Sequence, residues 1–189
     1  MEDKVDFQEL VHSTKTLTGL IPELEALLVE VGPLLKPQLA IVTDSFYEIL
    51  MTLPKAQPFL DGRIEGLKKA HINWLSSLFT GPFDEEFARS MYNVGMVHVK
   101  VKLPVEFMQG AATLIMGELV KVVAQSYSTD VQKQSRVIRA INSVIGYSVT
   151  IMQESYQASS LAEELEKFLA ITGMSRKLFN NLALAYTDK

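Results

Sequence analysis

Apolar residues recur at spacings of three and four along almost the whole chain. Such spacing places them on one face of an α-helix, and prolines and glycines between the runs mark helix boundaries. Strand-like alternation is confined to residues 97–103, which we interpret as a helix end that runs into a turn before Pro104. We therefore predict an all-α protein. The expected helices cover residues 6–13, 22–31, 36–52, 62–79, 84–98, 104–127, 131–169 and 175–186.

Three boundaries carry specific predictions. Gly32-Pro33 is expected to interrupt the helix that Pro22 opens, because proline disrupts a helix interior. Asp61 is expected to cap the helix that follows it, since a carboxylate accepts from free N–H groups at a helix start. Pro54 and Pro58 bracket a loop or short helical turn.

The two longest helices carry clear apolar stripes, which we read in two ways. The helices can pack on each other as an antiparallel pair, or they can pack on a second copy to form a four-helix dimer interface. We expect one domain over residues 1–155, with residues 156–189 as a helical extension or connector. The stripes comprise Met108, Ala112, Ile115, Leu119 and Val122 in the first helix, and Ile138, Ile141, Ile145, Ser148 and Met152 in the second.

Composition narrows the class of protein. The 189 residues are 48% hydrophobic and 21% charged, which is typical of a globular domain. A net charge of −4 argues against nucleic-acid binding, which needs clustered Lys and Arg. We see no run of about 18 uncharged apolar residues and an acidic, polar N-terminus, so we expect neither a membrane span nor a signal peptide, and a cytoplasmic location.

The chain has no cysteine, which excludes disulfides, iron–sulfur clusters, thiolate zinc sites and cysteine nucleophiles. No Gly-x-Ser-x-Gly, phosphate-binding glycine loop or kinase signature occurs. One Glu-x-x-His motif occurs, Glu9-Leu10-Val11-His12, but a di-iron site needs a second, and Asp-rich loops are missing. The sequence therefore predicts no di-iron, zinc or calcium site. We therefore do not expect an enzyme.

Three histidines remain as candidate ligands. His12 lies in the polar leading segment and is expected at the surface, whereas His71 can face either the interior or solvent. His98 lies between two valines, where it is either a hydrogen-bonded core residue or a metal or haem ligand. Gly95, three residues earlier, would let a flat cofactor or another backbone approach closely.

Three segments, in this order, resemble the globin-coupled sensors and protoglobins. The likeness covers about residues 15–155. Residues 44–50 (DSFYEIL) resemble the family's distal Phe-Tyr segment, and residues 75–87 (LSSLFTGPFDEEF) its turn between distal and proximal helices. Residues 94–101 (VGMVHVKV), followed by Leu103-Pro104, resemble its proximal-histidine helix.

The resemblance implies a globin fold, a three-on-three helical sandwich, with an N-terminal leading helix and an extra C-terminal helix. It implies haem b as cofactor, His98 as proximal iron ligand and Tyr47 as the hydrogen-bond donor to bound O2. Leu67 and Ala70 match the apolar and small positions of the distal helix, although Ala70 brings no hydroxyl for a second hydrogen bond. Phe59 is expected to pack on the haem face.

His71 is close to the distal positions, and some relatives have a distal histidine that binds iron, so His71 is a candidate sixth ligand. The implied function is a sensor of O2, or of CO or NO, that signals through the long helices and a homodimer. The last 35 or so residues are too few for a catalytic domain. The chain is therefore either the sensor domain of a longer protein, with an output domain or partner, or a stand-alone sensor globin. A haem enzyme of the NO dioxygenase or peroxidase kind, and a haem-free helical interaction module, are the alternatives.

Overall fold

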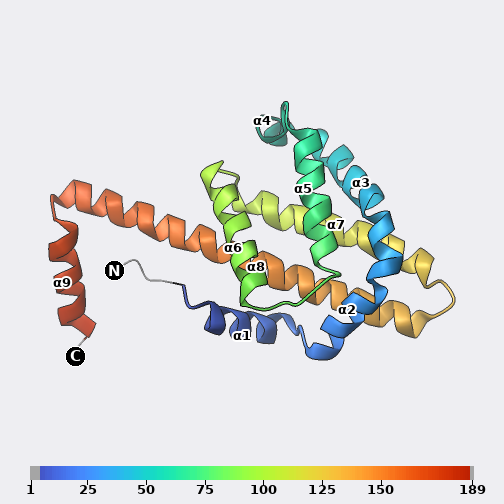
Figure 1. Cartoon of the computed structure of the whole chain (residues 1–189). Coiled ribbons are helices and arrows are strands. Elements are labelled where there is room, and N and C mark those ends of the chain that lie inside the picture. Colours follow the sequence, from blue (N-terminus) through green and yellow to red (C-terminus); the bar gives the residue numbers. More distant parts are fainter. Residues whose placement is uncertain (1–4, 188–189) are drawn as a thin grey trace.

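The computed structural model describes residues 5–187, without the side chains of residues 184, 186 and 187, and contains no strand within that range. The prediction of an all-α fold is confirmed (Figure 1). Residues 1–4 and 188–189, the outer ends of the two predicted domains, lie outside the described residues. The helices are α1 (Phe7–Thr18), α2 (Pro22–Leu35), α3 (Leu39–Met51), α4 (Gln57–Leu60), α5 (Ile64–Ser77), α6 (Glu85–Lys100), α7 (Val105–Ser126), α8 (Val131–Thr172) and α9 (Arg176–Thr187), with 3-10 turns at Lys36–Gln38 and Pro54–Ala56.

The interruption predicted at Gly32-Pro33 is wrong. Helix α2 continues through Pro33 to Leu35, and the chain tightens only afterwards, in the 3-10 turn that leads into α3. Gly32 is buried, and a Cβ atom there would lie 2.8 Å from the carbonyl oxygen of Phe79. Glycine at this position therefore permits a close helix contact and does not end the helix.

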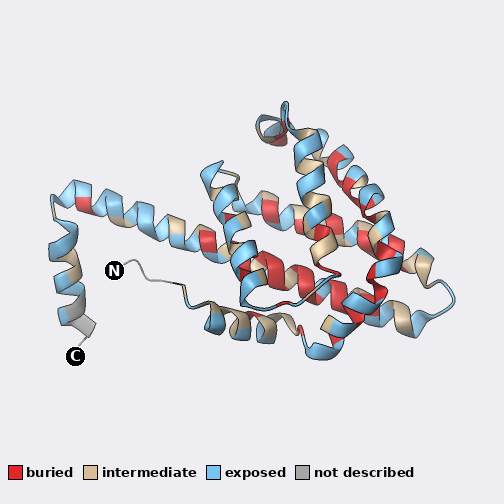
Figure 2. Ribbon diagram, viewed as in Figure 1, coloured by how far each residue is buried: buried red, intermediate tan, exposed pale blue. Residues whose placement is uncertain are grey.

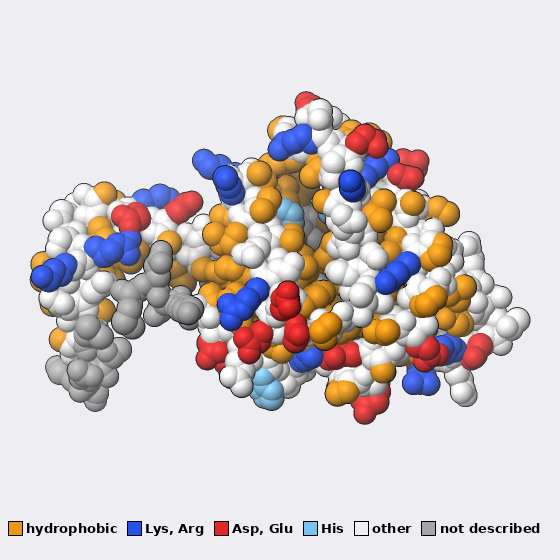
Figure 3. All heavy atoms as spheres, viewed as in Figure 1, with side chains coloured by type: hydrophobic (Ala, Val, Ile, Leu, Met, Phe, Trp, Pro, Cys, Tyr) orange, Lys and Arg blue, Asp and Glu red, His pale blue; other side chains and the backbone are white. Residues whose placement is uncertain are grey.

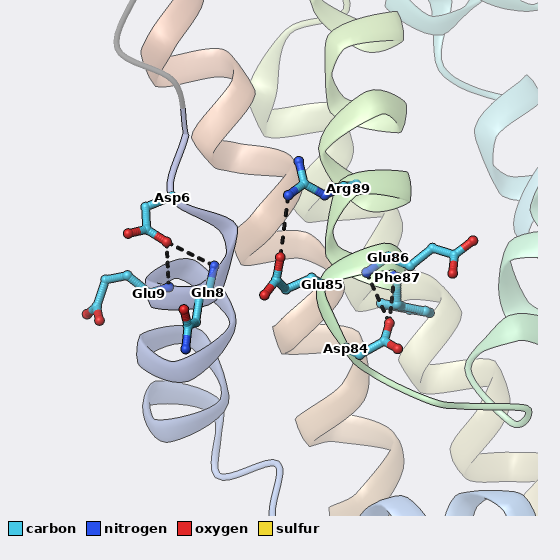
Figure 4. Close-up of polar contacts among 8 residues, drawn as sticks. All are labelled: Asp6, Gln8, Glu9, Asp84, Glu85, Glu86, Phe87 and Arg89. Carbon is cyan, nitrogen blue, oxygen red and sulfur yellow. Dashed lines mark hydrogen bonds and ion pairs between the residues drawn. The ribbon is translucent and has the colours of Figure 1, made fainter.

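Aspartates begin three of the helices. The Asp6 carboxylate accepts from the backbone N–H groups of residues 8 and 9, at 3.0 and 3.1 Å, at the start of α1. Asp84 accepts from those of residues 86 and 87, at 3.0 and 3.2 Å, at the start of α6 (Figure 4). Asp130 accepts from Lys133 at the start of α8. These caps satisfy N–H groups that have no partner inside the helix.

Asp61 does not cap α5, so that prediction is wrong. The helix begins at Ile64, and its N-cap residue, Arg63, makes no side-chain capping bond. Gly62, with φ of 70°, turns the chain between Asp61 and the helix. The local pattern of a capping residue before an apolar run did not reveal this extra turn.

Helix α8 is the centre of the body. It packs against α6, α7, α2 and α1, while α3 packs against α5 and α7. Most of its buried residues lie between Val137 and Ser155, in the part of α8 where red predominates in Figure 2. The stripes of α7 and α8 thus meet within the chain, as the first of the two sequence-based alternatives predicts.

The contact between α6 and α8 is closest at Gly95. A Cβ atom built there would lie 2.2 Å from Ser155 Oγ, 2.4 Å from the Met152 carbonyl oxygen and 3.0 Å from Met152 Cα. No side chain larger than hydrogen fits, because two of these atoms belong to the backbone of α8. Of the two roles predicted for Gly95, the structure supports approach by another backbone.

Beyond Ser155, α8 continues without a break for about five more turns and projects from the body (Figure 1). Most of its residues there are exposed, and α9 folds back on its end, where the rings of Phe168 and Phe179 lie 6.1 Å apart. The domain boundary predicted at residue 155 falls inside this continuous helix and stays a prediction.

Two helical stretches are long and apolar enough to cross a membrane by length and composition, Pro22–Met51 and Val105–Ser126. Both supply core residues, among them Leu28 and Leu35 in the first and Ile115 and Leu119 in the second, each at most 1% exposed. A core helix passes the same test of length and composition, so two such stretches are weak evidence for a membrane span.

Gly95→Ala is expected to destabilise the protein by about 1–3 kcal/mol, because the new methyl group would overlap the backbone of α8. The matched control is Gly66→Ala on α5, since a Cβ there meets no atom within 4 Å. Urea unfolding of both variants measures the free energy of unfolding. A Gly95→Ala protein as stable as wild type would mean that α6 and α8 are farther apart than described.

Candidate functional site

A cavity of about 400 Å³ lies among α3, α5, α6, α7 and α8. Its wall is mostly apolar, with side chains such as Phe46, Leu60, Val94, Phe107 and Ile115. The space-filling view shows a hollow on one face of the molecule, edged by hydrophobic side chains, with a histidine visible inside (Figure 3). A concave apolar site with few polar groups is the usual form of a cofactor or small-ligand pocket.

The structure brings together six of the seven residues predicted for the site. The cavity wall includes Tyr47, Phe59, Leu67, Ala70, His71 and His98. Gly95 is not part of the wall, because it is covered by the backbone of α8, and the prediction that it contacts a cofactor is not supported. These six residues are spread over positions 47–98 of the sequence, and the fold brings them to one cavity.

His98 reaches the cavity from the last turns of α6. Its Nδ1 atom is buried and has no hydrogen-bond partner, whereas Nε2 is not enclosed in this way. Burial lowers the pKa of His98, and the neighbouring His71 lowers it further, so the ring is neutral near pH 7. A neutral imidazole with a free Nε2 lone pair at an apolar cavity is suited to bind a metal ion.

Tyr47 and His71 form a hydrogen-bonded pair on the wall made by α3 and α5. The Tyr47 hydroxyl oxygen lies 2.6 Å from His71 Nδ1, and the same nitrogen lies 3.1 Å from the carbonyl oxygen of Leu67. Tyr47 is only 1% exposed, and burial raises its pKa well above the usual range. Its hydroxyl therefore keeps its proton and can donate it.

His71 lies at the cavity in the structure without any rearrangement. Burial lowers the pKa of His71, while the bond to the Leu67 carbonyl opposes this shift. Because α5 carries His71 and α6 carries His98, two neutral imidazoles face the same space from different helices.

Several wall residues were missed by the sequence-based reasoning. Among the described residues that line the cavity, Arg63 is the only Lys or Arg, and its guanidinium donates to the Pro58 carbonyl at 3.0 Å. Trp74 lines the cavity one turn after His71 and keeps a buried Nε1 without a partner. The spacing of three between His71 and Trp74 was a usable signal, because such residues share a helix face.

The residues present fit the haem that the family resemblance implies. The fit depends on His98, whose imidazole is held at an apolar wall with one nitrogen unpartnered and buried. The wall is otherwise apolar, as a porphyrin ring requires, and one cation lies in it. Among the described residues no group of three or more His, Asp or Glu residues forms another metal site.

The solved structures to which this chain is similar include globin domains of sensor proteins. The globin domain of a Geobacter sulfurreducens globin-coupled sensor matches with a TM-score of 0.71 and 24% identity, covering 77% of this chain and 96% of that one. The globin domain of E. coli DosC matches in a ferrous and a ferric form, each with a TM-score of 0.64 and 20% identity, covering 77% of this chain and 99% of DosC's. The predicted globin fold is thus confirmed.

A search of curated proteins gives no significant match. The protoglobin family model, in contrast, matches residues 7–162, which is most of the chain and includes every residue named in the cavity wall. On this evidence the chain belongs to the protoglobin family.

Proposed function

We propose that this protein binds haem b in the cavity and uses it to sense a diatomic gas. The observation that carries the proposal is the meeting of His98 and Tyr47 at one apolar cavity, the first with a free imidazole nitrogen and the second with a protonated hydroxyl. When bound, haem iron held by one histidine supplies an open coordination position for O2, CO or NO.

Each part of the wall has a role in this proposal. His98 would hold the iron through Nε2, and Arg63 would bind a carboxylate of the porphyrin, since it is the one cation among the lining residues. Phe59 and Phe107, whose rings lie 6.1 Å apart, close the apolar wall near the α4 corner. Leu67 and Ala70 keep the α5 side of the cavity free of further hydroxyl groups.

Tyr47 would donate a hydrogen bond to a polar diatomic ligand. Such a bond favours O2 over CO, because negative charge that develops on O2 is stabilised by a nearby donor. His71 stays a candidate sixth ligand, which a gas would have to displace.

We further propose that α7 and α8 carry the signal outward and pair with a second copy of the chain. A groove of about 530 Å³ lies between these helices, and its wall includes Thr113, Met116, Ile145 and Thr150. Since α8 contributes both to the cavity wall and to the groove, movement at the site can reach the interface through one helix. We propose a cytoplasmic, non-enzymatic protein whose output domain or partner receives this movement.

His98→Ala is expected to abolish or strongly alter the Soret band of the haem-loaded protein, because the proximal ligand is removed. Ultraviolet–visible spectra in the ferric, ferrous, O2 and CO forms measure this. His12→Ala is the matched control, since His12 is exposed on α1 and should leave the spectra unchanged. Wild-type protein that takes up no haem would contradict the sensor proposal and favour a haem-free module, and steady turnover with a reductant would favour an enzyme.

Arg63→Ala is expected to speed the loss of haem severalfold, up to about tenfold, because one charge-assisted hydrogen bond at an exposed edge would be missing. Transfer of haem to an excess of a high-affinity acceptor protein measures the rate. Arg63→Lys should lose haem at an intermediate rate, because it keeps the charge. Equal rates for all three proteins would place the carboxylates elsewhere.

Thr113→Arg is expected to convert a dimer to a monomer, because Thr113 lines the groove and a long charged side chain there would occupy the space that a second copy needs. Sedimentation velocity at micromolar concentration measures the mass. Gln132→Arg, at the exposed start of α8 and away from the groove, is the control. A wild-type protein that is already monomeric would exclude this dimer.

A further inference from the structure

One nitrogen of His71 lies within hydrogen-bond distance of two oxygens, the Tyr47 hydroxyl and the Leu67 backbone carbonyl. Nδ1 of His71 lies 2.6 Å from the Tyr47 hydroxyl and 3.1 Å from the Leu67 carbonyl oxygen. A hydroxyl can donate or accept, but a carbonyl oxygen can only accept. The carbonyl therefore decides between the two possible positions of the imidazole proton.

A proton on Nδ1 satisfies both contacts. The N–H then lies between two acceptors, the Leu67 carbonyl and the Tyr47 oxygen, as in the shared bonds common near helix turns. A proton on Nε2 would instead turn the Nδ1 lone pair toward the Leu67 carbonyl oxygen, and two lone pairs would face each other at 3.1 Å. The neutral imidazole carries one ring proton, so the two positions exclude each other.

We propose that His71 donates from Nδ1 to Tyr47 and Leu67, and that it is thereby the positioning residue for the Tyr47 hydroxyl. Tyr47 then accepts from His71, and its own proton is free to point into the cavity. Nε2 of His71 carries a lone pair and is not among the buried, unpartnered atoms of the described residues, so it opens toward the cavity that the ring lines.

With this proton position, Tyr47 and His71 have opposite hydrogen-bonding roles toward the cavity. Tyr47 presents a proton to the cavity, and His71 presents a lone pair. A ligand that accepts a hydrogen bond is held by Tyr47, whereas an electron-pair acceptor is held by His71. In the opposite arrangement Tyr47 would donate to Nδ1, and the Nε2–H of His71 would be the donor toward the cavity.

The inference rests on the proposed function only where it concerns a gas ligand. The proton position itself is a property of the protein without haem. The two claims can therefore fail separately, and the first experiment needs no cofactor.

The test is a long-range ¹H–¹⁵N correlation spectrum of the haem-free protein at pH 7.5, with ¹⁵N-labelled histidine. The chain has three histidines, so His12→Gln and His98→Gln assign the signals. We expect His71 to carry its proton on Nδ1 in wild type and in Tyr47→Phe, because the Leu67 carbonyl is present in both. A proton on Nε2 in wild type, or a shift from Nε2 to Nδ1 in Tyr47→Phe, would overturn the proposal.

The haem-loaded protein supplies the second readout, the rate of O2 dissociation. His71→Leu and Tyr47→Phe should each raise it, His71→Leu by up to about tenfold, because Tyr47 loses the bond that orients it. The double variant should be no faster than Tyr47→Phe, because His71 acts through Tyr47. His71→Gln should partly restore slow dissociation, since its amide can donate to Tyr47.

Additive effects in the double variant would overturn the positioning role, because His71 would then act on the ligand by itself. A protein that takes up no haem but shows the proton on Nδ1 would keep the Tyr47–His71 arrangement and contradict the sensor proposal alone.

Discussion

The site depends on how closely α6 lies against α8. Gly95 permits this approach, because a side chain there would overlap the Met152 backbone and the Ser155 hydroxyl. Less than one turn later, α6 presents His98 to the cavity, and the Met152 side chain forms part of the same wall. The helix that carries the candidate iron ligand is therefore held by contact with the central helix, and the position of His98 follows from a residue that does not reach the cavity.

Polar groups at this cavity are few, and the loss of stability caused by burying a polar group without a partner explains how they are arranged. A buried polar group without a partner destabilises a fold by about 1–3 kcal/mol. Tyr47 and His71 avoid this cost by bonding to each other and to the Leu67 carbonyl. His98 Nδ1 and Trp74 Nε1, in contrast, are buried without a hydrogen-bond partner. Unpartnered groups of this kind gather at functional sites, since selection retains them there against stability.

Helix α8 connects the cavity with the rest of the molecule. Its 42 residues run from the core, past Val149 and Met152 at the cavity wall, to the exposed end where α9 folds back (Figure 1). A helix transmits displacement along its axis because its backbone hydrogen bonds resist bending within a few turns. The same element that shapes the site therefore reaches the surface at which we propose that a second copy or an output domain binds.

Local signals predicted the helices well. The apolar spacing, with prolines and glycines between the runs, predicted the fold class and most helix boundaries, because these signals act within a few residues. The family resemblance, carried by three short segments, added the roles of Tyr47 and His98.

Two glycines show what the sequence alone did not determine. Gly32 is predicted from sequence to end a helix, and Gly95 to admit either a flat cofactor or another backbone. In the structure each permits the close approach of a distant backbone, and only the tertiary structure identifies which backbone. The bond between Tyr47 and His71 joins residues 24 positions apart on two helices, so no local pattern encodes it. The sequence determined the helices and the candidate ligands, since these depend on neighbours along the chain. The tertiary structure decided which polar atoms pair and which stay free, since that depends on how the helices pack.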